Sequence, residues 1–378
     1  MNEIVFVTHN KGKAKSAEKY FRNMKFSTFD FELDEPRSDD IKEIATAKVK
    51  QAYSIVKKPC IALDTGFFIE ALNGFPRAFV NFSLDTIGIE GILKLMQGVE
   101  NRKCKFEECL AYHDGKEIHY FYGKHPGNLA EKIQGKDREE KWSDLWYIFK
   151  PEHFDKTLAE MNQEERENRR KIDGSVEALK VFAKWYEKEN EYQEIYNKHK
   201  KLIDIAIEKT KLCEKDPLHF IGHTIDVINY EKELLETFNA DKEVCIISAY
   251  WHDVGRSVCD KGHEEESGKI LKEEMKKLNY DDDMIEKCYL AVINHKRKSI
   301  LPTIEGKILR DADKIAYIGK NRWDRCMKEN MHELNEIVDV YLPILRDEIL
   351  RFEESRKIFD RDMNNYVKGY LEEMKKGI

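Results

Sequence analysis

The sequence predicts two domains, an N-terminal α/β domain with a mixed central sheet and a C-terminal all-helical bundle around a metal ion. Three observations support this division. The chain has 378 residues, more than one ordinary core holds. Its first half opens with the β-branched run IVFVT, followed at once by a polar turn and a helix-like segment. Its second half contains apolar helical segments that carry histidines and aspartates.

We expect the two domains at residues 1–186 and 214–378, joined by residues 187–213. The joining segment is highly charged, lacks Gly and Pro, and has apolar residues at three-to-four spacing, which favours one or two helices over a flexible tether. The last stretch, from NRWDRC to LEEMKK, is also amphipathic. Its helices either close the C-terminal bundle or form the face of a homodimer.

Composition narrows the class of protein. A net charge of -7, with 36% charged and 41% hydrophobic residues, is typical of a soluble globular protein and gives no basic surface for nucleic acid. The eight cysteines form no CxxC pair, which favours a reduced, cytoplasmic protein. The N-terminus lacks the basic start and apolar core of a signal peptide. No segment approaches the roughly 18 to 20 apolar residues that a membrane span needs.

The C-terminal half is organised around His252-Asp253, in the stretch ISAYWHDVGRSV. An imidazole beside a carboxylate, at the end of an apolar helix and before Gly255, offers two neighbouring metal ligands. Taken alone, the pair favours the simpler interpretation of a helix-end histidine next to a capping carboxylate.

Three further segments supply possible ligands. LHFIGHTIDV places His219 and His223 on one face of a helix, and VINHK places His295 at the end of another. ILRDADKIAYIG sets Asp311 and Asp313 among aliphatic residues. Buried carboxylates cost roughly several kcal/mol if they are left unpaired, so they need a cation or a hydrogen-bond partner. A bound metal would meet that need.

The order H…HD…D, taken as His223, His252, Asp253 and Asp313, resembles the HD phosphohydrolase superfamily over about residues 214 to 330. The adjoining segments AYWHDVGR, GHEEESGKIL and ILRDADK are similar as well. The resemblance implies that these four residues bind a metal, that Asp253 is also catalytic, and that the reaction is hydrolysis of a phosphate ester or anhydride. Mn²⁺ or another transition ion suits a site that contains histidine.

The same resemblance ranks the remaining candidates. Asp313 is preferred to Asp311 because it directly precedes a basic residue, Lys314, which is expected to offset the charge of the substrate. Asp311 is then a candidate second-layer residue. His263 and His295 either complete a second metal site, bind substrate phosphate, or act as acid/base groups.

In the N-terminal half, the run IVFVT predicts a buried strand and NKGKAKSAEKYF a turn and helix. The first amides of such a helix lack partners and form an anion site, to which Lys13 adds positive charge. Farther on, DDIKEIATAKVKQAY is helical and carries Glu43 and Lys48 as a candidate functional pair. Considered individually, these charges are also consistent with an ordinary solvated surface.

CIALDTGFFIEALNGFP predicts a buried strand that ends in Asp64, a turn at Thr65-Gly66 and a later turn at Asn73-Gly74. Functional carboxylates are often found at the carboxyl end of a strand in an α/β sheet. Alternatively, Asp64 only caps the next turn.

These segments resemble the inosine triphosphate pyrophosphatase family over about residues 1 to 186. VTHNKGK matches the family's T-x-N-x-x-K phosphate motif through Thr8, Asn10 and Lys13, and ALDTGFF matches its acidic segment through Asp64. The resemblance implies an α/β domain that hydrolyses a nucleoside triphosphate to a monophosphate and pyrophosphate. Thr8, Asn10 and Lys13 would then bind substrate.

EIATAKVKQA matches the family's Glu-plus-Lys helix through Glu43 and Lys48. The resemblance implies that Lys48 binds substrate and that Glu43 and Asp64 bind the metal, with Asp64 also catalytic. Mg²⁺ suits a phosphate site with oxygen ligands.

The N-terminal half departs from the family pattern at the site itself. Leu63-Asp64 stands where the family usually has two adjacent acids, so one potential metal ligand is missing. The G-F/W-G-Y-D-P segment is replaced by residues 142–147, and the S-H-R segment by residues 173–175. Because these two segments form the base pocket in the family, base recognition is rewritten here.

The sequence therefore predicts a two-domain, metal-dependent nucleotide hydrolase. A second hypothesis makes the N-terminal half a catalytically inactive nucleotide-binding regulator of a single HD enzyme. A purely structural role is disfavoured because it leaves the histidines and aspartates of the C-terminal half without a purpose.

Overall fold

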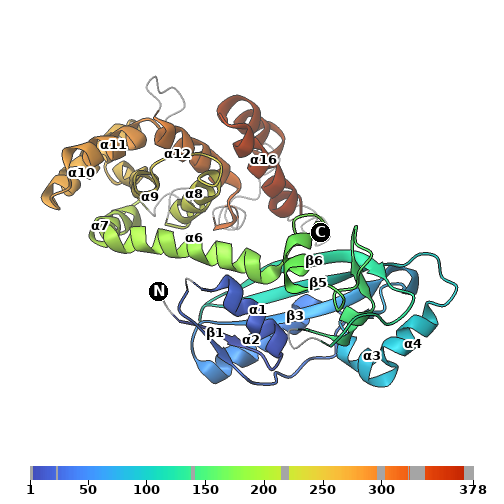
Figure 1. Ribbon diagram of the computed structural model, residues 1–378. Coiled ribbons are helices and arrows are strands. Elements are labelled where there is room, and N and C mark those ends of the chain that lie inside the picture. The colour runs from blue at the N-terminus through green and yellow to red at the C-terminus, as the bar shows by residue number, and fades with distance from the viewer. Residues whose placement is uncertain are drawn as a thin grey trace. The chain divides into compact units, whose positions relative to one another are not determined.

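The computed structural model divides the chain into two compact units, Met1–Glu191 and Tyr192–Ile378 (Figure 1). It describes residues 3–22, 24–137, 141–213, 221–295, 303–321, 323 and 337–369. Each unit contains hydrophobic clusters of its own. None of the helices in these ranges is long and apolar enough to cross a membrane.

The first unit is built on a sheet whose strands follow the order β2-β1-β3-β5-β6-β7, with β4 paired to β3. Strand β1 pairs in parallel with β2 and β3, whereas β5, β6 and β7 extend the sheet in antiparallel fashion. This confirms the predicted α/β domain with a mixed sheet. The strands are β1 (Ile4–Val7), β2 (Phe26–Phe29), β3 (Cys60–Ile69), β4 (Pro76–Arg77), β5 (Lys103–His113), β6 (Ile118–Leu129) and β7 (Phe149–Pro151).

Helices cover both faces of this sheet. Ile4 and Phe6 of β1 pack with α1 and the start of α6, whereas Val5 and Val7 pack with α2. Because successive side chains of a strand point to opposite faces, these helices lie on opposite sides of the sheet. The helices that begin in this unit are α1 (Lys11–Tyr20), α2 (Ile41–Val56), η1 (Glu70–Leu72), α3 (Val80–Thr86), α4 (Gly88–Leu95), η2 (Asp144–Tyr147), α5 (Gln163–Arg169) and α6 (Ala178–Lys198).

One strand is longer than the sequence predicts. Strand β3 does not end at Asp64 but continues through it, so the prediction of a turn at Thr65-Gly66 is wrong. The reason is that every residue of β3, from Cys60 to Ile69, pairs with β5. This ladder uses the backbone groups on both sides of Asp64. The predicted turn at Asn73-Gly74 is present, with φ angles of 54° and 87°.

Every secondary-structure element in the described residues of the second unit is a helix, as predicted. Two hydrophobic clusters form its core, and α7 contributes Leu202 and Ala206 to one of them. Its helices after α6 are α7 (Lys200–Lys211), α8 (Ile221–Leu234), α9 (Lys242–Trp251), η3 (Val254–Ser257), α10 (His263–Lys277), α11 (Asp282–Ile293), α12 (Ile304–Ile315), η4 (Ala316–Ile318), η6 (Ile337–Tyr341), α15 (Leu342–Ile344), η7 (Leu345–Ile349), α16 (Glu353–Asp362) and η8 (Met363–Lys368).

Helix α8 buries Glu231 completely, and its carboxyl group has no hydrogen-bond partner in the part of the chain that the structure describes. Burial raises the pKa of Glu231 well above its ordinary value of 4.5. Its contribution to stability is therefore fully present below pH 4.5 and is lost as the pH rises through the folded-state pKa.

We expect Glu231→Gln to raise the free energy of unfolding at neutral pH, because the amide stays neutral. The free energy of unfolding should also fall less steeply with rising pH in the variant than in the wild type. The difference between the two slopes should be at most about 1.4 kcal/mol per pH unit. Denaturant unfolding between about pH 5 and about pH 8 measures this, with exposed Glu265→Gln as the control. An unchanged pH dependence in Glu231→Gln would contradict this account.

Candidate active sites

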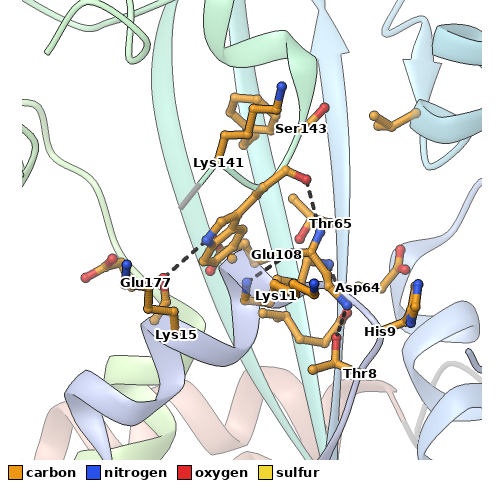
Figure 2. Close-up of a pocket in the computed structure, with 18 of the residues that line it drawn as sticks. Thr8, His9, Lys11, Lys15, Asp64, Thr65, Glu108, Lys141, Ser143 and Glu177 are labelled. Carbon is orange, nitrogen blue, oxygen red and sulfur yellow. Dashed lines mark hydrogen bonds between the residues drawn. The ribbon is translucent and has the colours of Figure 1, made fainter. Parts of the chain in front are cut away.

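A cavity of about 880 Å³ lies in the first unit, lined by residues of α1, β3, β5 and β6 (Figure 2). This volume falls within the range typical of pockets for small ligands. In Figure 2, Asp64 and Thr8 lie on one side of the labelled group, Glu177 and Lys15 on the other, and Glu108 between them. The cavity therefore brings together side chains from distant parts of the N-terminal half.

The loop between β1 and α1 brings the predicted Thr8 and Asn10 to this cavity, and the first turn of α1 brings Lys13. The side chain of Asn10 caps α1 by accepting a hydrogen bond from the backbone N–H of Lys13 at 2.9 Å. The hydroxyl of Thr8 accepts one from the backbone N–H of Asn10 at 3.2 Å. This cap shapes a helix N-terminus at the cavity wall, which is a suitable place for an anion.

Lys13 is half-buried in the cavity wall, and its Nζ donates to the carbonyl of Leu63 at 3.1 Å. Burial, followed by repulsion from Lys48, lowers the pKa of Lys13 to about 8. Lys13 is thus a cation at neutral pH but loses its charge under mildly alkaline conditions.

We expect the affinity of the cavity for a polyphosphate to fall as the pH rises through about 8, because neutral Lys13 no longer attracts the anion. Calorimetric titration with tripolyphosphate between about pH 6.5 and about pH 9.5 measures this effect. Lys13→Arg should bind without the decrease, because a guanidinium stays charged. A wild-type affinity that is constant over this range would contradict the prediction.

Lys48 projects from α2 to two carboxylates at the same end of the cavity. Its Nζ lies 2.8 Å from Oδ1 of Asp64 and also donates to Glu35. The side chain of Asp64 is only 7% exposed, whereas that of Glu35 is 44% exposed. Burial by itself would lower the pKa of Lys48. The attraction of Asp64 and Glu35 outweighs burial and raises this pKa above its ordinary value. The cation holds the two acids near each other.

Glu43 is not among the residues that line the cavity. It lies on the first turn of α2, exposed to solvent, and accepts a hydrogen bond from the Ser38 hydroxyl at 2.6 Å. Glu35, which sequence reasoning missed, lies there instead and contacts Lys48. It stands in the acidic run between β2 and α2, but no periodic pattern distinguishes it from its acidic neighbours.

The segments that depart from the family pattern also surround the cavity. The indole N–H of Trp142 donates to Ser16 at 3.2 Å, and its backbone carbonyl accepts from Asn10 at 3.0 Å. Asp173 does not line the cavity but pairs with Arg169, which does. The segments that replace the base-pocket motifs therefore still form or support the cavity wall.

In the second unit, six side chains from five helical segments meet in the interior. They form two groups, in each of which the ligand atoms lie within 4.8 Å of one another. Nε2 of His223 lies 3.2 Å from Oδ1 of Asp313, and Nε2 of His263 lies 3.1 Å from Oδ1 of Asp253. The groups are His223, His252 and Asp313, and Asp253, His263 and His295.

The orientation of three imidazoles fits a metal. Nδ1 of His252 donates to the carbonyl of Ala249 at 2.7 Å, and Nδ1 of His263 donates to the carbonyl of Asp260 at 2.9 Å. Nδ1 of His295 donates to the carbonyl of Val292 in α11. Each ring then keeps its Nε2 lone pair for another partner, the usual arrangement of metal-binding histidines. Nε2 of His252 is buried and accepts no hydrogen bond from the described residues. Leaving such an atom unmatched costs about 1–3 kcal/mol.

Two cations border the groups. Nζ of Lys314 lies 2.6 Å from Oδ2 of Asp313, and Nε of Arg256 lies 3.0 Å from Oδ1 of Asp253. Lys314 was predicted here, whereas Arg256 was not. Its position three residues after Asp253 on the same helical turn is the signal that identifies it.

The charges in this cluster are set by burial and by close partners. Burial by itself would raise the pKa of Asp313. The neighbouring Lys314 and His223 outweigh burial and hold this pKa well below its usual range. Burial and the neighbouring His252 lower the pKa of His295 to about 4, so its ring is neutral near pH 7. Asp253 raises the pKa of His263 despite burial. Ionised carboxylates and a neutral imidazole are the forms that bind metals.

Two neighbouring candidates do not join the cluster. The carboxylate of Asp311 accepts the backbone N–H groups of Arg351 and Phe352 at 2.8 and 2.9 Å, so it anchors the start of α16 and is not a second-layer residue. His219 lies outside the described residues.

Comparison with known proteins extends these findings. Residues 4–185 match the Ham1 family and residues 220–318 match the HD domain. A dITP/XTP pyrophosphatase from Thermococcus kodakarensis is 38% identical over 189 residues, which cover 50% of this chain and 98% of that protein. One from Methanopyrus kandleri is 37% identical over 49% of this chain and 96% of that protein.

A solved HD superfamily hydrolase from an uncultured Thermotogales bacterium is 21% identical, with a TM-score of 0.36, over 48% of this chain and 94% of that one. The sequence matches define the class of the protein: it is a hydrolase of phosphate esters or anhydrides, as predicted. The chain belongs to the Ham1 family through its N-terminal half and carries an HD domain in its C-terminal half.

Proposed function

We propose that the protein is a two-domain, metal-dependent nucleotide hydrolase. Its Ham1 domain cleaves a nucleoside triphosphate to a monophosphate and pyrophosphate, and its HD domain hydrolyses a phosphate ester or anhydride of a nucleotide. The observation that carries this proposal is the convergence of cations, carboxylates and imidazoles from distant segments at one place in each unit. The relatives named for dITP and XTP cleavage support the first activity.

In the Ham1 domain, the phosphates are bound at the start of α1. The hydroxyl of Thr8, the side chain of Asn10 and the ammonium group of Lys13 surround the unpaired amides of the first helical turn. Lys48, which pairs with Asp64 and Glu35, adds a second cation to the cavity. The triphosphate is thus neutralised by groups that are already in position.

Asp64 and Glu35 hold Mg²⁺, which prefers oxygen ligands. When bound, the ion supplies Lewis acidity at a phosphoryl oxygen and makes water easier to deprotonate. Asp64 accepts the proton of the attacking water, and the hydrogen bond from Lys48 orients its carboxylate. Glu35 takes the ligand position that the sequence assigns to Glu43.

We expect Glu35→Gln to lower kcat/KM for pyrophosphate release by about 100-fold or more, because changes that only support a metal ligand already cost about 10- to 100-fold. It should also raise the Mg²⁺ concentration needed for half activity. Glu43→Gln is the matched control, because Glu43 lies on the exposed first turn of α2 and does not line the cavity. Steady-state kinetics over a Mg²⁺ series measure both variants. A large effect of Glu43→Gln with none of Glu35→Gln would restore the original assignment.

In the HD domain, His223, His252 and Asp313 hold one divalent ion, and Asp253, His263 and His295 hold a second. Mn²⁺ or another transition ion suits the mixture of imidazole and carboxylate donors. Lys314 and Arg256, whose side chains are 21% and 20% exposed, bind the phosphate of the substrate at the edge of the cluster. Asp253 orients the attacking water between the two groups.

The two activities form a sequence if the HD domain accepts the monophosphate released by the Ham1 domain. Fusion in one chain supports this order. Incubation of the wild-type protein with a triphosphate that the Ham1 domain cleaves should then release inorganic phosphate after pyrophosphate. Monophosphate that accumulates unchanged would exclude the sequence.

A second function is supported by the pairing at Lys48, which already compensates both carboxylates of the cavity. In that case the Ham1 domain binds a nucleotide without cleaving it and regulates the HD domain. Nucleotide would then alter the turnover of the HD domain, and Asp64→Asn would leave the products unchanged.

A further inference from the structure

We propose that His9, oriented by Asp30, binds the terminal phosphate of the nucleotide and makes the Ham1 cavity selective for triphosphates over diphosphates. This inference rests on the proposed function, in which the cavity holds a nucleoside triphosphate at the start of α1. It adds a binding residue, His9, and a positioning residue, Asp30, neither of which the sequence motifs assign.

The pairing of β1 with β2 brings these two residues together. Val7 and Phe29 are register partners at the carboxyl ends of the two parallel strands. The backbone N–H of Thr8 then donates to the carbonyl of Phe29 at 3.1 Å. His9 directly follows Thr8, and Asp30 directly follows Phe29. Both residues therefore lie at the edge of the sheet where α/β proteins usually bind their ligands.

The imidazole of His9 is held through one of its two nitrogens. Nδ1 donates to Oδ1 of Asp30 at 2.7 Å. An imidazolium donates from both nitrogens, so the same ring can bind a carboxylate through Nδ1 and a phosphate oxygen through Nε2. The two side chains are 70% and 69% exposed. Because exposed ion pairs add little to stability, the pair is better explained by a role in binding.

His9 lines the open side of the cavity, whereas Asp64, which acts on the reacting phosphate, is only 5% exposed. Figure 2 shows His9 on the same side of the labelled group as Thr8 and Asp64, opposite Glu177. The cavity also extends along α1 as far as Tyr20, so the nucleoside has room on that side of the reacting phosphate. The two leaving phosphates then extend the other way, toward His9.

The charges nearby separate this role from a general attraction of anions. Lys11 and Lys13 of α1 line the same cavity and attract any phosphate. Asp30 and Asp34 both belong to the segment after β2, and by charge alone each of them repels a polyanion. Their partners differ, because Asp34 accepts a hydrogen bond from the side-chain amide of Gln51 at 2.7 Å. Removal of the two acids should therefore change binding in different directions.

The test measures the dissociation constants of inosine triphosphate (ITP) and inosine diphosphate (IDP) by calorimetry with the full-length protein. Divalent ions are left out to prevent cleavage, and the pH is about 6, where imidazoles are largely protonated. We expect His9→Ala to weaken the binding of ITP by about tenfold and that of IDP by less than about twofold, because only the triphosphate reaches His9. Binding to the HD domain contributes equally to every variant, since the changes lie in the first unit.

Asp30→Ala should also weaken the binding of ITP, by about threefold or more, although it removes a negative charge beside a polyanion. Asp34→Ala is the matched control, because it removes an acid that lines the cavity and should leave the binding of ITP unchanged or tighter. In the His9→Ala protein, Asp30→Ala should no longer weaken binding, since Asp30 acts through the imidazole. A merely structural effect of Asp30→Ala would persist in that background.

Thermal unfolding checks that the variants keep their fold, as expected for exposed side chains. An ITP/IDP ratio unchanged in His9→Ala, tighter binding of ITP by Asp30→Ala, or no binding of ITP overturns the inference. Pyrophosphate release from ITP with Mg²⁺ tests the proposed function separately. A protein that binds ITP through His9 but releases no pyrophosphate loses only the proposed activity, whereas one that releases pyrophosphate without any effect of His9→Ala on binding loses only the inference.

Discussion

Asp64→Asn should abolish pyrophosphate release by the Ham1 domain while leaving the fold intact. Asp64 is 5% exposed, and its Oδ1 contacts Lys48 at 2.8 Å. An amide has the same shape and still accepts that hydrogen bond, so β3 and its pairing with β5 are preserved. It cannot take a proton from water, however, and it binds a divalent ion poorly. Loss of a positioned general base typically costs about 10²- to 10⁴-fold.

The measurement is pyrophosphate release under saturating Mg²⁺, together with thermal unfolding of both proteins. Asp85→Asn is the control for the loss of one acidic charge, because Asp85 is exposed on α3. Unchanged release by a folded Asp64→Asn protein would remove Asp64 from catalysis and would favour the regulatory function.

Asp253→Ala should remove the activity of the HD domain and most of its bound metal. Asp253 contacts both ligand groups, because Oδ1 lies 3.1 Å from Nε2 of His263 and Oδ2 lies 3.5 Å from Nε2 of His252. It also pairs with Arg256, which is proposed to bind phosphate. Changes in residues that only support metal ligands cost about 10- to 100-fold, so the loss of a ligand itself should exceed about 100-fold.

Metal analysis of the purified protein and phosphate release with Mn²⁺ measure this prediction. Asp283→Asn controls for the loss of charge, since Asp283 is exposed on α11 and pairs only weakly with Lys287 at the surface. A variant that keeps its full metal content and turnover would show that Asp253 is neither ligand nor catalyst.

Short motifs were predicted well because their geometry is local. Thr8, Asn10 and Lys13 lie within one turn of the start of α1, where a capping side chain and a helix end dictate their arrangement. The same holds for His252 and Asp253, which are adjacent in the chain. For such residues, spacing along the sequence is nearly equivalent to position in space.

Long-range partners were predicted less well. Glu43 has the spacing of a helix pair with Lys48, but the partner that reaches Lys48 is Glu35, on a loop whose path the sequence does not determine. Strand β3 was ended too early because its length depends on pairing with β5, far along the chain. Glu108 and His125 escaped notice because only the register of β5 and β6 brings them together.

The most direct test of two active sites is product analysis over a panel of nucleoside tri- and monophosphates, with Mg²⁺ or Mn²⁺, for wild type, Asp64→Asn and Asp253→Ala. We predict that Asp64→Asn loses only pyrophosphate release and that Asp253→Ala loses only the second product. If every activity disappears with Asp253→Ala and survives Asp64→Asn, the Ham1 domain is a binding or regulatory domain and the HD site is the single enzyme.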